Sequence, residues 1–443
     1  MKQLRALYLN NRLFTASSAV VVFFILSFVL NLWIVIPQIL FFLLVAACAA
    51  DYILLFRIRV GLRGHRIMAE KLSNGDDNAI KIHLESYYPF KVTLNILDEI
   101  PHQFQRRELD FLLTLASGEK KTIQYWLRPV KRGTYSFGSI NVFAQTPIGF
   151  LSRRFRFAGD TDVPVYPSYV QMRKYELLAL SNNLTDSGIK RIRRIGQNRE
   201  FELIKEYVPG DDFRTINWKA TARRNHLMVN HYQDERSQQV YCLIDKGRVM
   251  QMPFNGLSLL DYAINASLVI SNIAIKKSDK AGLLTFQDKV GSMVVAGRRN
   301  NQMAQILEAL YNQKTAYRET DFSSLYNRVR RKINQRSLLL IFTNFESIFG
   351  LRRQLPYIKM LSLQHLVVVI FFENTEMKSL LESPASTLKE VYQKAIAEKF
   401  SFEKRQIVKE LAMHGIQSLL TAPDQLTVNT INKYLELKSR GMI

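Results

Sequence analysis

Two adjacent carboxylates, Asp211 and Asp212, follow a proline–glycine turn and precede several arginines. Neighbouring carboxylates can act as the acid and the base of a hydrolytic reaction. Such a pair needs a titratable partner, and the nearest is the lone His226. We therefore favour a salt-bridged corner, with the arginines on the carboxylates and Trp218 packed beneath. The candidate residues of this segment are Tyr207, Pro209, Gly210, Asp211, Asp212, Arg214, Trp218 and Arg223.

A third carboxylate, Asp245, ends the apolar run that begins at Val240. From residue 239 onward, apolar strand-like runs alternate with helical patterns. Strands are expected at 240–245, 281–286, 290–295, 337–343, 366–372 and 416–420, and helices at 257–274, 301–311, 322–332 and 425–437. This alternation predicts a doubly wound α/β domain over 239–443, with a parallel sheet covered on both faces. Ligands of such sheets lie at the carboxyl ends of the strands, where Asp245 lies.

Short alternating strands fill the region before it, at 80–84, 91–96, 122–127 and 139–143, with turn residues between them. They predict a β-sandwich domain over 67–170, immunoglobulin-like in architecture. Residues 171–238 then form a linker together with the carboxylate-bearing segment.

Two apolar stretches open the chain, at 14–32 and 33–56, and each is long enough to cross a bilayer. Basic residues precede the first and follow the second, so both ends are expected on the cytoplasmic side. We predict a two-helix transmembrane anchor over 1–66, permanent rather than a cleaved signal. Asp51, near the inner end, is expected to reach lipid headgroups or to pair with Arg57.

The formal net charge is +23 over 443 residues, of which 47% are hydrophobic, and only two are cysteines. This composition excludes disorder and a disulfide framework, and it favours a reducing compartment. Beside an anchor, the basic surplus suits an anionic lipid surface. Nucleic acid is not the expected partner, because the basic cluster 190–194 lacks interleaved aromatic residues.

The segment from Tyr207 to Arg223 resembles the domain of unknown function 58 family, which carries a Tyr-x-Pro-Gly-Asp-Asp-x-Arg-x-Ile-x-Trp motif. An Arg-Gly-x-Tyr element at 132–135 and the turn at 146–149 also look like this family. Thr146 stands where the family has Asp, a change expected to weaken a turn cap. The resemblance implies a bacterial membrane protein with a von Willebrand factor A-like domain, associated with MoxR-type AAA+ ATPases.

The resemblance also implies a divalent metal site, built from an Asp-x-Ser-x-Ser loop, a later Thr and an Asp after the fourth strand. Here Asp245 and Thr320 match, but Gly247 and Val249 replace both serines and Asn344 replaces the second Asp. Two hydroxyl ligands and one carboxylate are missing. We expect a degenerate, metal-free site, with a weakly bound magnesium ion as the alternative. Asp245 is then expected to pair with Lys246, with Arg248 or with a basic residue of a partner protein.

These features predict a scaffold or adaptor, anchored in the bacterial inner membrane by two spans, with its other domains in the cytoplasm. Its partners would be proteins, including a MoxR-type AAA+ ATPase implied by the resemblance. No phosphate-binding loop, zinc-protease motif or nucleophile elbow occurs, so we do not expect an enzyme. The alternatives are a hydrolase or ligand-binding enzyme that uses Asp211, Asp212 and Asp245, and a nucleic-acid binder near the membrane.

Overall fold

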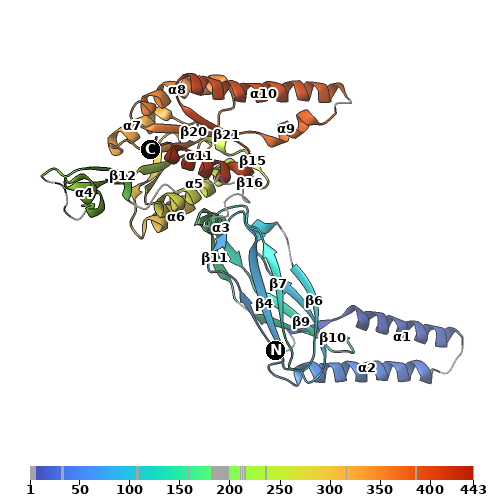
Figure 1. The fold of residues 1–443 in the computed structure, drawn as a ribbon. Helices are drawn as coiled ribbons and strands as arrows, with labels where there is room; N and C mark the ends of the chain where they lie inside the picture. The colour runs from blue at the N-terminus through green and yellow to red at the C-terminus, as the bar shows by residue number, and fades with distance from the viewer. Residues whose placement is uncertain are drawn as a thin grey trace. The chain divides into compact units, whose positions relative to one another are not determined.

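The computed structural model describes residues 6–30, 34–105, 109–157, 159–180, 199–209, 211, 213, 216–234, 237–315, 317–384 and 387–442. The chain forms two compact units, Met1–Tyr166 and Pro167–Ile443. Two apolar N-terminal helices and several β-sheets make it a multidomain protein, as expected (Figure 1). The predicted boundaries at 66, 170 and 238 stay predictions, as do the immunoglobulin-like and von Willebrand factor A-like assignments.

The first unit begins with a short strand, β1 (Leu7–Leu9), and the antiparallel helices α1 (Asn11–Val29) and α2 (Val35–Phe56). Both helices are apolar enough to span a membrane and expose most of their side chains, which suggests membrane anchoring. A third helix, Leu259–Lys276, also meets the length and composition of a span, but it is largely buried. Its apolar residues belong to a protein core instead.

Including β1, the described residues of this unit form eleven strands. They are β1, β2 (Leu62–Ile67), β3 (Leu72–Ser73), β4 (Asn78–Ser86), β5 (Val92–Asp98), β6 (Leu109–Leu115), β7 (Lys120–Leu127), β8 (Gly133–Phe137), β9 (Ile140–Gln145), β10 (Leu151–Phe157) and β11 (Thr161–Tyr166). They form sheets in the orders β1-β10-β9-β5-β6, β2-β4-β7 and β3-β11-β8. Alternate residues of β4 and β5 are buried, so the sheets enclose one hydrophobic core.

The second unit is built on a six-stranded sheet in the order β18-β17-β14-β19-β20-β21. Its strands are β14 (Gln239–Asp245), β17 (Lys280–Phe286), β18 (Val290–Gly297), β19 (Leu338–Phe342), β20 (Leu366–Phe372) and β21 (Gln417–Thr421). All neighbours are parallel except β17 and β18. That pair is antiparallel because the turn between the two strands is too short for a crossover.

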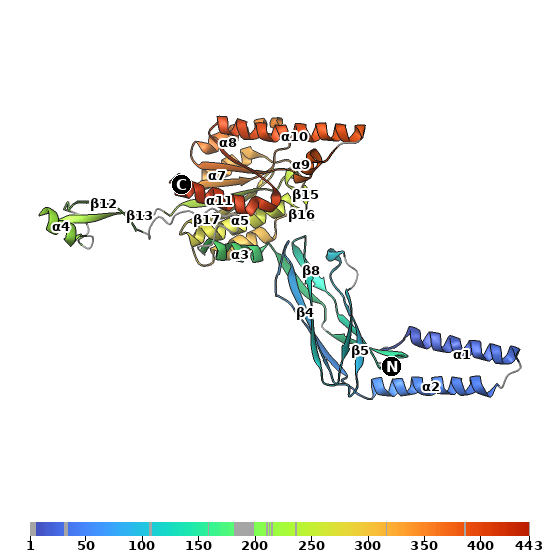
Figure 2. The same ribbon diagram turned by 45° about the vertical axis from the view of Figure 1, so that its right-hand side comes forward.

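Helices cover both faces of this sheet, as the sequence pattern predicts (Figures 1 and 2). One face is packed by α3 (Tyr169–Leu180), α5 (Leu259–Lys276), α6 (Gln302–Tyr311) and α11 (Leu426–Ser439). The other is packed by α7 (Phe322–Lys332), α8 (Ile348–Ser362) and α10 (Leu388–Met413), with α9 (Thr375–Glu382) beside α10. The sequence patterns did not predict α3, α8, α9 or α10. The expected linker thus begins with a helix, α3, whose Met172 and Tyr175 pack on the core.

The carboxylate-bearing segment lies between β12 (Arg199–Glu206) and β13 (Met228–Asp234), which pair as a hairpin. A short helix, α4 (Trp218–Arg224), lies between the two strands. Asn217 caps α4 by accepting a hydrogen bond from the Ala220 amide at 3.0 Å. Asn225 ends it in the left-handed conformation, φ 56°, which asparagine tolerates better than most residues. The described part of the segment therefore contains a capped helix between the two strands.

Candidate functional site: the carboxyl edge of the six-stranded sheet

Asp245 lies at the point where the strand order of the sheet reverses. From β14 the chain first builds β17 on one side and later β19 on the other, so the loops after β14 and β19 separate at this edge. In parallel α/β sheets this is where a ligand crevice forms. Asp245 ends β14, and Thr343 and Asn344 follow β19 directly. The topology thus brings together the residues that the sequence placed at a site.

The carboxylate of Asp245 is closed off by protein donors. Its Oδ1 accepts hydrogen bonds from Thr320 Oγ1 at 2.6 Å and from the Gly247 amide at 2.7 Å, while Oδ2 accepts from Thr343 Oγ1 at 2.7 Å. The side chain is completely buried. Burial raises the pKa of Asp245, although the three hydrogen bonds lower it. Asp245 therefore lies in a neutral, hydroxyl-lined environment.

The expected ion pair with Lys246 or Arg248 is not among the contacts of Asp245 in the described part of the chain. The backbone explains the difference: the Lys246 amide donates to the Phe286 carbonyl and the Arg248 amide to the Arg318 carbonyl. The Arg248 side chain is exposed. Hydroxyl groups rather than cations satisfy the carboxylate.

The position of Gly247 has no room for a metal-binding serine. A Cβ atom there would lie 2.0 Å from Thr320 Oγ1 and 3.0 Å from Asp245 Oδ1. The first distance is shorter than real Cβ contacts, so a side chain at position 247 would displace the Thr320 hydroxyl from its hydrogen bond to Asp245. The arrangement does not fit the magnesium site that the resemblance implies, because the loop hydroxyl is missing and Asp245 is already bonded. The absence of a cofactor stays a prediction.

Asn344 is held by a lysine that the sequence reasoning missed. Lys404 Nζ, on α10, donates to Asn344 Oδ1 and to the Phe345 carbonyl, both at 2.6 Å. Its ammonium lies 5.7 Å from the centroid of the Phe371 ring. Desolvation lowers the pKa of Lys404 to about 8, although Glu346 opposes the shift. No sequence signal could have linked these residues, because they lie far apart in the chain on different elements.

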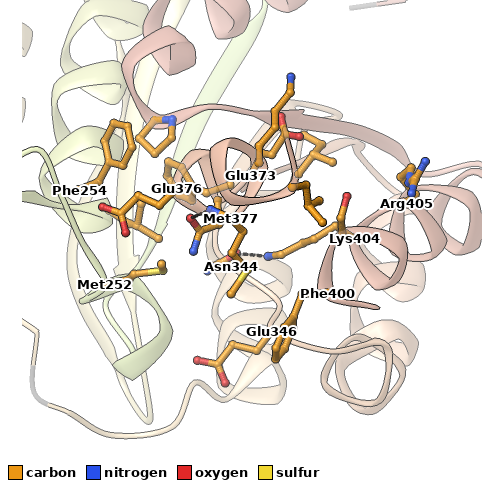
Figure 3. Close-up of a pocket in the computed structure, with 18 of the residues that line it drawn as sticks. Met252, Phe254, Asn344, Glu346, Glu373, Glu376, Met377, Phe400, Lys404 and Arg405 are labelled. Carbon is orange, nitrogen blue, oxygen red and sulfur yellow. Dashed lines mark hydrogen bonds between the residues drawn. The ribbon is translucent and has the colours of Figure 1, made fainter. Parts of the chain in front are cut away.

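Two cavities flank Asn344. One, of about 340 Å³, is lined by residues including Met252, Phe254, Met377, Phe400 and Lys404 (Figure 3). In Figure 3 Lys404 reaches in from α10 toward Asn344, while Glu376 and Met377 lie on the opposite side. The other cavity, of about 410 Å³, is lined by Asp245, Thr320, Asn344, Phe349, Arg353 and others. The edge therefore has two hollows, one mostly apolar and one ringed by charged side chains.

The rim of the larger hollow combines an exposed aromatic ring with charges. Phe349, in the first turn of α8, is 76% exposed. Arg353, one helical turn further, forms an ion pair with Glu319 at 3.2 Å. Exposed rings beside arginine are typical of protein-binding surfaces.

The described part of the Asp211 segment differs from the predicted corner in the exposure of Trp218, and the expected arginine contacts of the carboxylates stay a prediction. Asp211 Oδ1 pairs with Lys205 at 2.9 Å, and Oδ2 accepts from the Val208 amide at 3.1 Å. Trp218 is 70% exposed instead of packed beneath the carboxylates. Tyr207 lies against Phe213, with ring centroids 5.5 Å apart. Pro209 and Arg223 are exposed, whereas Gly210, Asp212 and Arg214 lie outside the described residues.

Comparison with known proteins supports the family resemblance. The model of a family described as protein of unknown function DUF58 matches residues 204–399. The uncharacterized protein YeaD of Bacillus subtilis (strain 168) is 25% identical over 205 residues, which are 44% of this chain and 50% of YeaD. The chain thus spans about half the length of this curated relative. Both matches support the DUF58 family, whose function is unknown.

Solved structures give weaker likenesses. The conserved hypothetical protein BatB from Bacteroides thetaiotaomicron is 10% identical and covers 46% of this chain and all of its own, with a TM-score of 0.29. The CARDB domain of a Pyrococcus furiosus protein is 13% identical and covers 24% of this chain and 91% of its own, with a TM-score of 0.18. Scores this low support no assignment of fold or function.

Proposed function

We propose that this protein is a membrane-anchored adaptor whose second unit binds a protein partner at the carboxyl edge of its six-stranded sheet. The observation that carries the proposal is that Asp245 is buried and fully hydrogen-bonded, while the rim of the cavity that it lines is exposed. The carboxylate accepts three internal hydrogen bonds, whereas Phe349 beside it is exposed. A surface of this kind suits recognition better than chemistry.

The partner that the family resemblance implies is a MoxR-type AAA+ ATPase, acting in the assembly or remodelling of other complexes. Membrane anchoring by the two N-terminal helices in the bacterial inner membrane, with the other domains in the cytoplasm, belongs to the same proposal. A von Willebrand factor A-like second unit is consistent with the order and direction of its strands. An immunoglobulin-like first unit is consistent with the antiparallel pairing of most of its strands.

The enzyme alternative has less support. It requires Asp211, Asp212 and Asp245 as a reactive group, but Asp211 is paired with Lys205 and Asp245 is fully buried. Paired or enclosed carboxylates make poor general bases unless a substrate displaces their partners. The nucleic-acid alternative depends on the cluster 190–194, which lies outside the described residues.

Site-specific crosslinking tests the adaptor proposal. A photoreactive amino acid at Phe349 should crosslink to an AAA+ ATPase in cells, and Phe349→Asp in the tagged chain should abolish capture of that ATPase. Leu363, just after the other end of α8 and 85% exposed, supplies the matched control position. It lies about 20 Å along the helix, away from the rim. Asp245→Arg is unsuitable because it would bury a cation.

Equal crosslinking from positions 349 and 363, or full capture by Phe349→Asp, would contradict a partner surface at this edge. Crosslinks only from position 349 to a protein that is not an ATPase would keep the adaptor proposal and remove the implied partner.

A further inference from the structure

We propose that the β-rich part of the first unit is itself a membrane-surface module that Asp51 clamps to the transmembrane hairpin. Its base, the end from which the two helices leave the sheets, then lies in the headgroup layer. This inference goes beyond the adaptor proposal, which requires only a tether. It corrects two expectations, because Asp51 is completely buried against a loop of the β-sheet and Thr146 keeps its turn cap. The partner that this surface binds is an anionic lipid bilayer.

The clamp is a buried carboxylate bonded to a loop of the β-sheet. Asp51 is completely buried near the end of α2. Its Oδ2 accepts hydrogen bonds from the amides of Phe150 at 2.9 Å and Leu151 at 2.8 Å, and its Oδ1 accepts from the Thr146 hydroxyl. Charge-assisted hydrogen bonds that are shielded from water are strong. Removing one donor would leave a buried carboxylate oxygen without a partner, which costs the free energy of its desolvation.

Thr146 completes the clamp on the loop side. Its hydroxyl oxygen accepts from the amides of Ile148 at 3.2 Å and Gly149 at 3.3 Å while it donates to Asp51. The turn cap is therefore preserved, and the threonine hydroxyl provides the donor that a carboxylate at this position would lack. Two facing aspartates would repel each other, so Thr146 suits Asp51.

A second attachment holds the end of α2. Arg153, on β10, donates to the carbonyls of Leu55 at 2.8 Å, Ile58 at 2.7 Å and Arg59 at 3.0 Å. Tyr88 donates its hydroxyl to the Leu55 carbonyl at 3.0 Å. The last carbonyls of a helix need such donors when they are withdrawn from water. Side chains from the β-sheets thus satisfy the end of the membrane helix.

The other leg of the hairpin is attached to the same loop and strand. β1, just before α1, pairs with β10 in antiparallel register from Leu7 to Leu9. Asn10 then donates its backbone amide to the Phe150 carbonyl and its side-chain amide to the Gly149 carbonyl, both at 3.0 Å. Both helices therefore leave the sheet from hydrogen-bonded residues, with no flexible linker on either side (Figure 2).

The length of α2 sets how deep the base lies. From Val35 to Asp51 the helix rises about 24 Å, less than the ~30 Å of a bilayer's hydrocarbon core. Apolar exposure continues past Asp51 at Tyr52, Ile53 and Leu54, and β1 exposes Tyr8 and Leu9. Tyrosines gather at membrane interfaces, where the ring is buried and the hydroxyl stays wet. The base of the sheet is therefore expected to enter the interface.

The charges at the base complement lipid phosphates. Arg12 lies in the first turn of α1 and Arg57 and Arg59 follow α2, and all three are exposed. Within the part of the chain that the structure describes, no carboxylate lies at ion-pair distance from these guanidinium groups. Basic groups near an anionic leaflet are attracted to it.

Spin-label depth measurement tests the proposal on the full chain in phosphatidylcholine–phosphatidylglycerol vesicles. One label is placed at Val60, just after α2, and a reference label at Thr134 on β8, which lies far from the hairpin (Figure 2). Cys48 and Cys242 are replaced by alanine so that only the chosen positions carry a label. The label at position 60 should be shielded from a water-soluble nickel chelate and accessible to oxygen in the lipid. Equal exposure of both labels to the chelate would overturn the proposal.

The clamp is tested by the distance distribution between labels at Val45 on α2 and Lys120 on β7. The distribution should be narrow in the wild type and broad in Asp51→Ala. The control Asp110→Ala removes an exposed aspartate on β6 and should leave the distribution narrow. If Asp51→Ala fails to fold, Thr146→Val removes only one of the three donors and should broaden the distribution less. A narrow distribution in both clamp variants would show that Asp51 does not hold the two parts together.

Discussion

Asp245 combines a complete set of hydrogen bonds with complete burial, and the two have opposite effects on its charge. Desolvation favours the neutral acid, whereas the donors from Thr320, Thr343 and Gly247 favour the carboxylate. Desolvation is the larger cause, so the pKa of Asp245 lies above its ordinary value. A metal-binding carboxylate would need the opposite arrangement, with free oxygens and an adjacent cation.

The first prediction concerns Asp245→Asn. Because the folded state holds the Asp245 proton to a higher pH than the unfolded state, this group contributes stability at low pH that is lost as pH rises through the raised pKa. An asparagine cannot ionise and can keep all three contacts if the Thr343 hydroxyl turns to accept. We expect its melting temperature to equal or exceed that of the wild type, by a margin that grows with pH.

Thermal unfolding of the full chain in detergent, at a series of pH values from acidic to neutral, measures this margin. Asp279→Asn is the matched control, because Asp279 is also buried but forms an ion pair with Lys438 at 2.9 Å. That change should destabilise the protein. A large loss of stability in Asp245→Asn at neutral pH would mean that the carboxylate is charged and needed.

Lys404 gives a second prediction at the residue scale. Its pKa falls from the ordinary 10.5 to about 8, so between these values the unfolded state holds a proton that the folded state has released. Stability should therefore rise as pH increases through this window, because the cost of a buried cation disappears. In Lys404→Met the rise should be absent, and in Lys399→Met, which changes an exposed lysine of the same helix, it should persist. A rise of the same size in Lys404→Met would assign it to other groups.

At the scale of elements, two helices carry the same cap in different settings. Ser258 caps α5 and Thr387 caps α10, each in a reciprocal capping box with the acidic residue three positions later. α5 is buried along most of its length in the core of the second unit, whereas the first turns of α10 are exposed. The same chemistry should therefore matter differently for global stability.

The third prediction is that Ser258→Ala lowers the free energy of unfolding by about 1 kcal/mol, whereas Thr387→Ala changes it much less. The reason is that α10 can fray at its exposed start without disturbing the core, but α5 cannot. Urea unfolding followed by far-ultraviolet circular dichroism compares the two. Equal losses would indicate that the start of α10 unfolds together with the core.

At the scale of the whole molecule, the two units differ in their dependence on the membrane helices. The core of the first unit includes Leu55 of α2, and Asp51 bonds to its loop. The second unit has its own two cores, one on each face of the six-stranded sheet. Anchor removal should therefore affect the units unequally.

The fourth prediction is that a chain consisting of residues 167–443 folds cooperatively without detergent, whereas residues 60–166 alone do not. The shorter piece loses β1 and the end of α2, which leaves the edge of β10 and the amides of Phe150 and Leu151 without partners. Circular dichroism melting of both pieces measures this. A sharp melt of residues 60–166 would show that the hairpin is dispensable for the β-sheets.

The amino-acid sequence determined the features that depend on local pattern. The two apolar stretches, the alternating strands such as 80–84 and the continuous apolar strands such as 366–372 correspond to α1, α2, β4 and β20. Side-chain period and apolar length follow from backbone geometry, so they can be read without knowing the fold. Asp245 and Asn344 were also placed at one edge, because the carboxyl ends of parallel strands meet there.

Only the tertiary structure decided what each polar group contacts. Asp51 meets Thr146 and Lys404 meets Asn344 across long stretches of chain, and no spacing rule connects such residues. Asp211 forms an ion pair with Lys205 and Trp218 is exposed, and neither arrangement follows from the sequence pattern. Pattern specifies elements through local geometry, whereas polar partners depend on how distant elements pack.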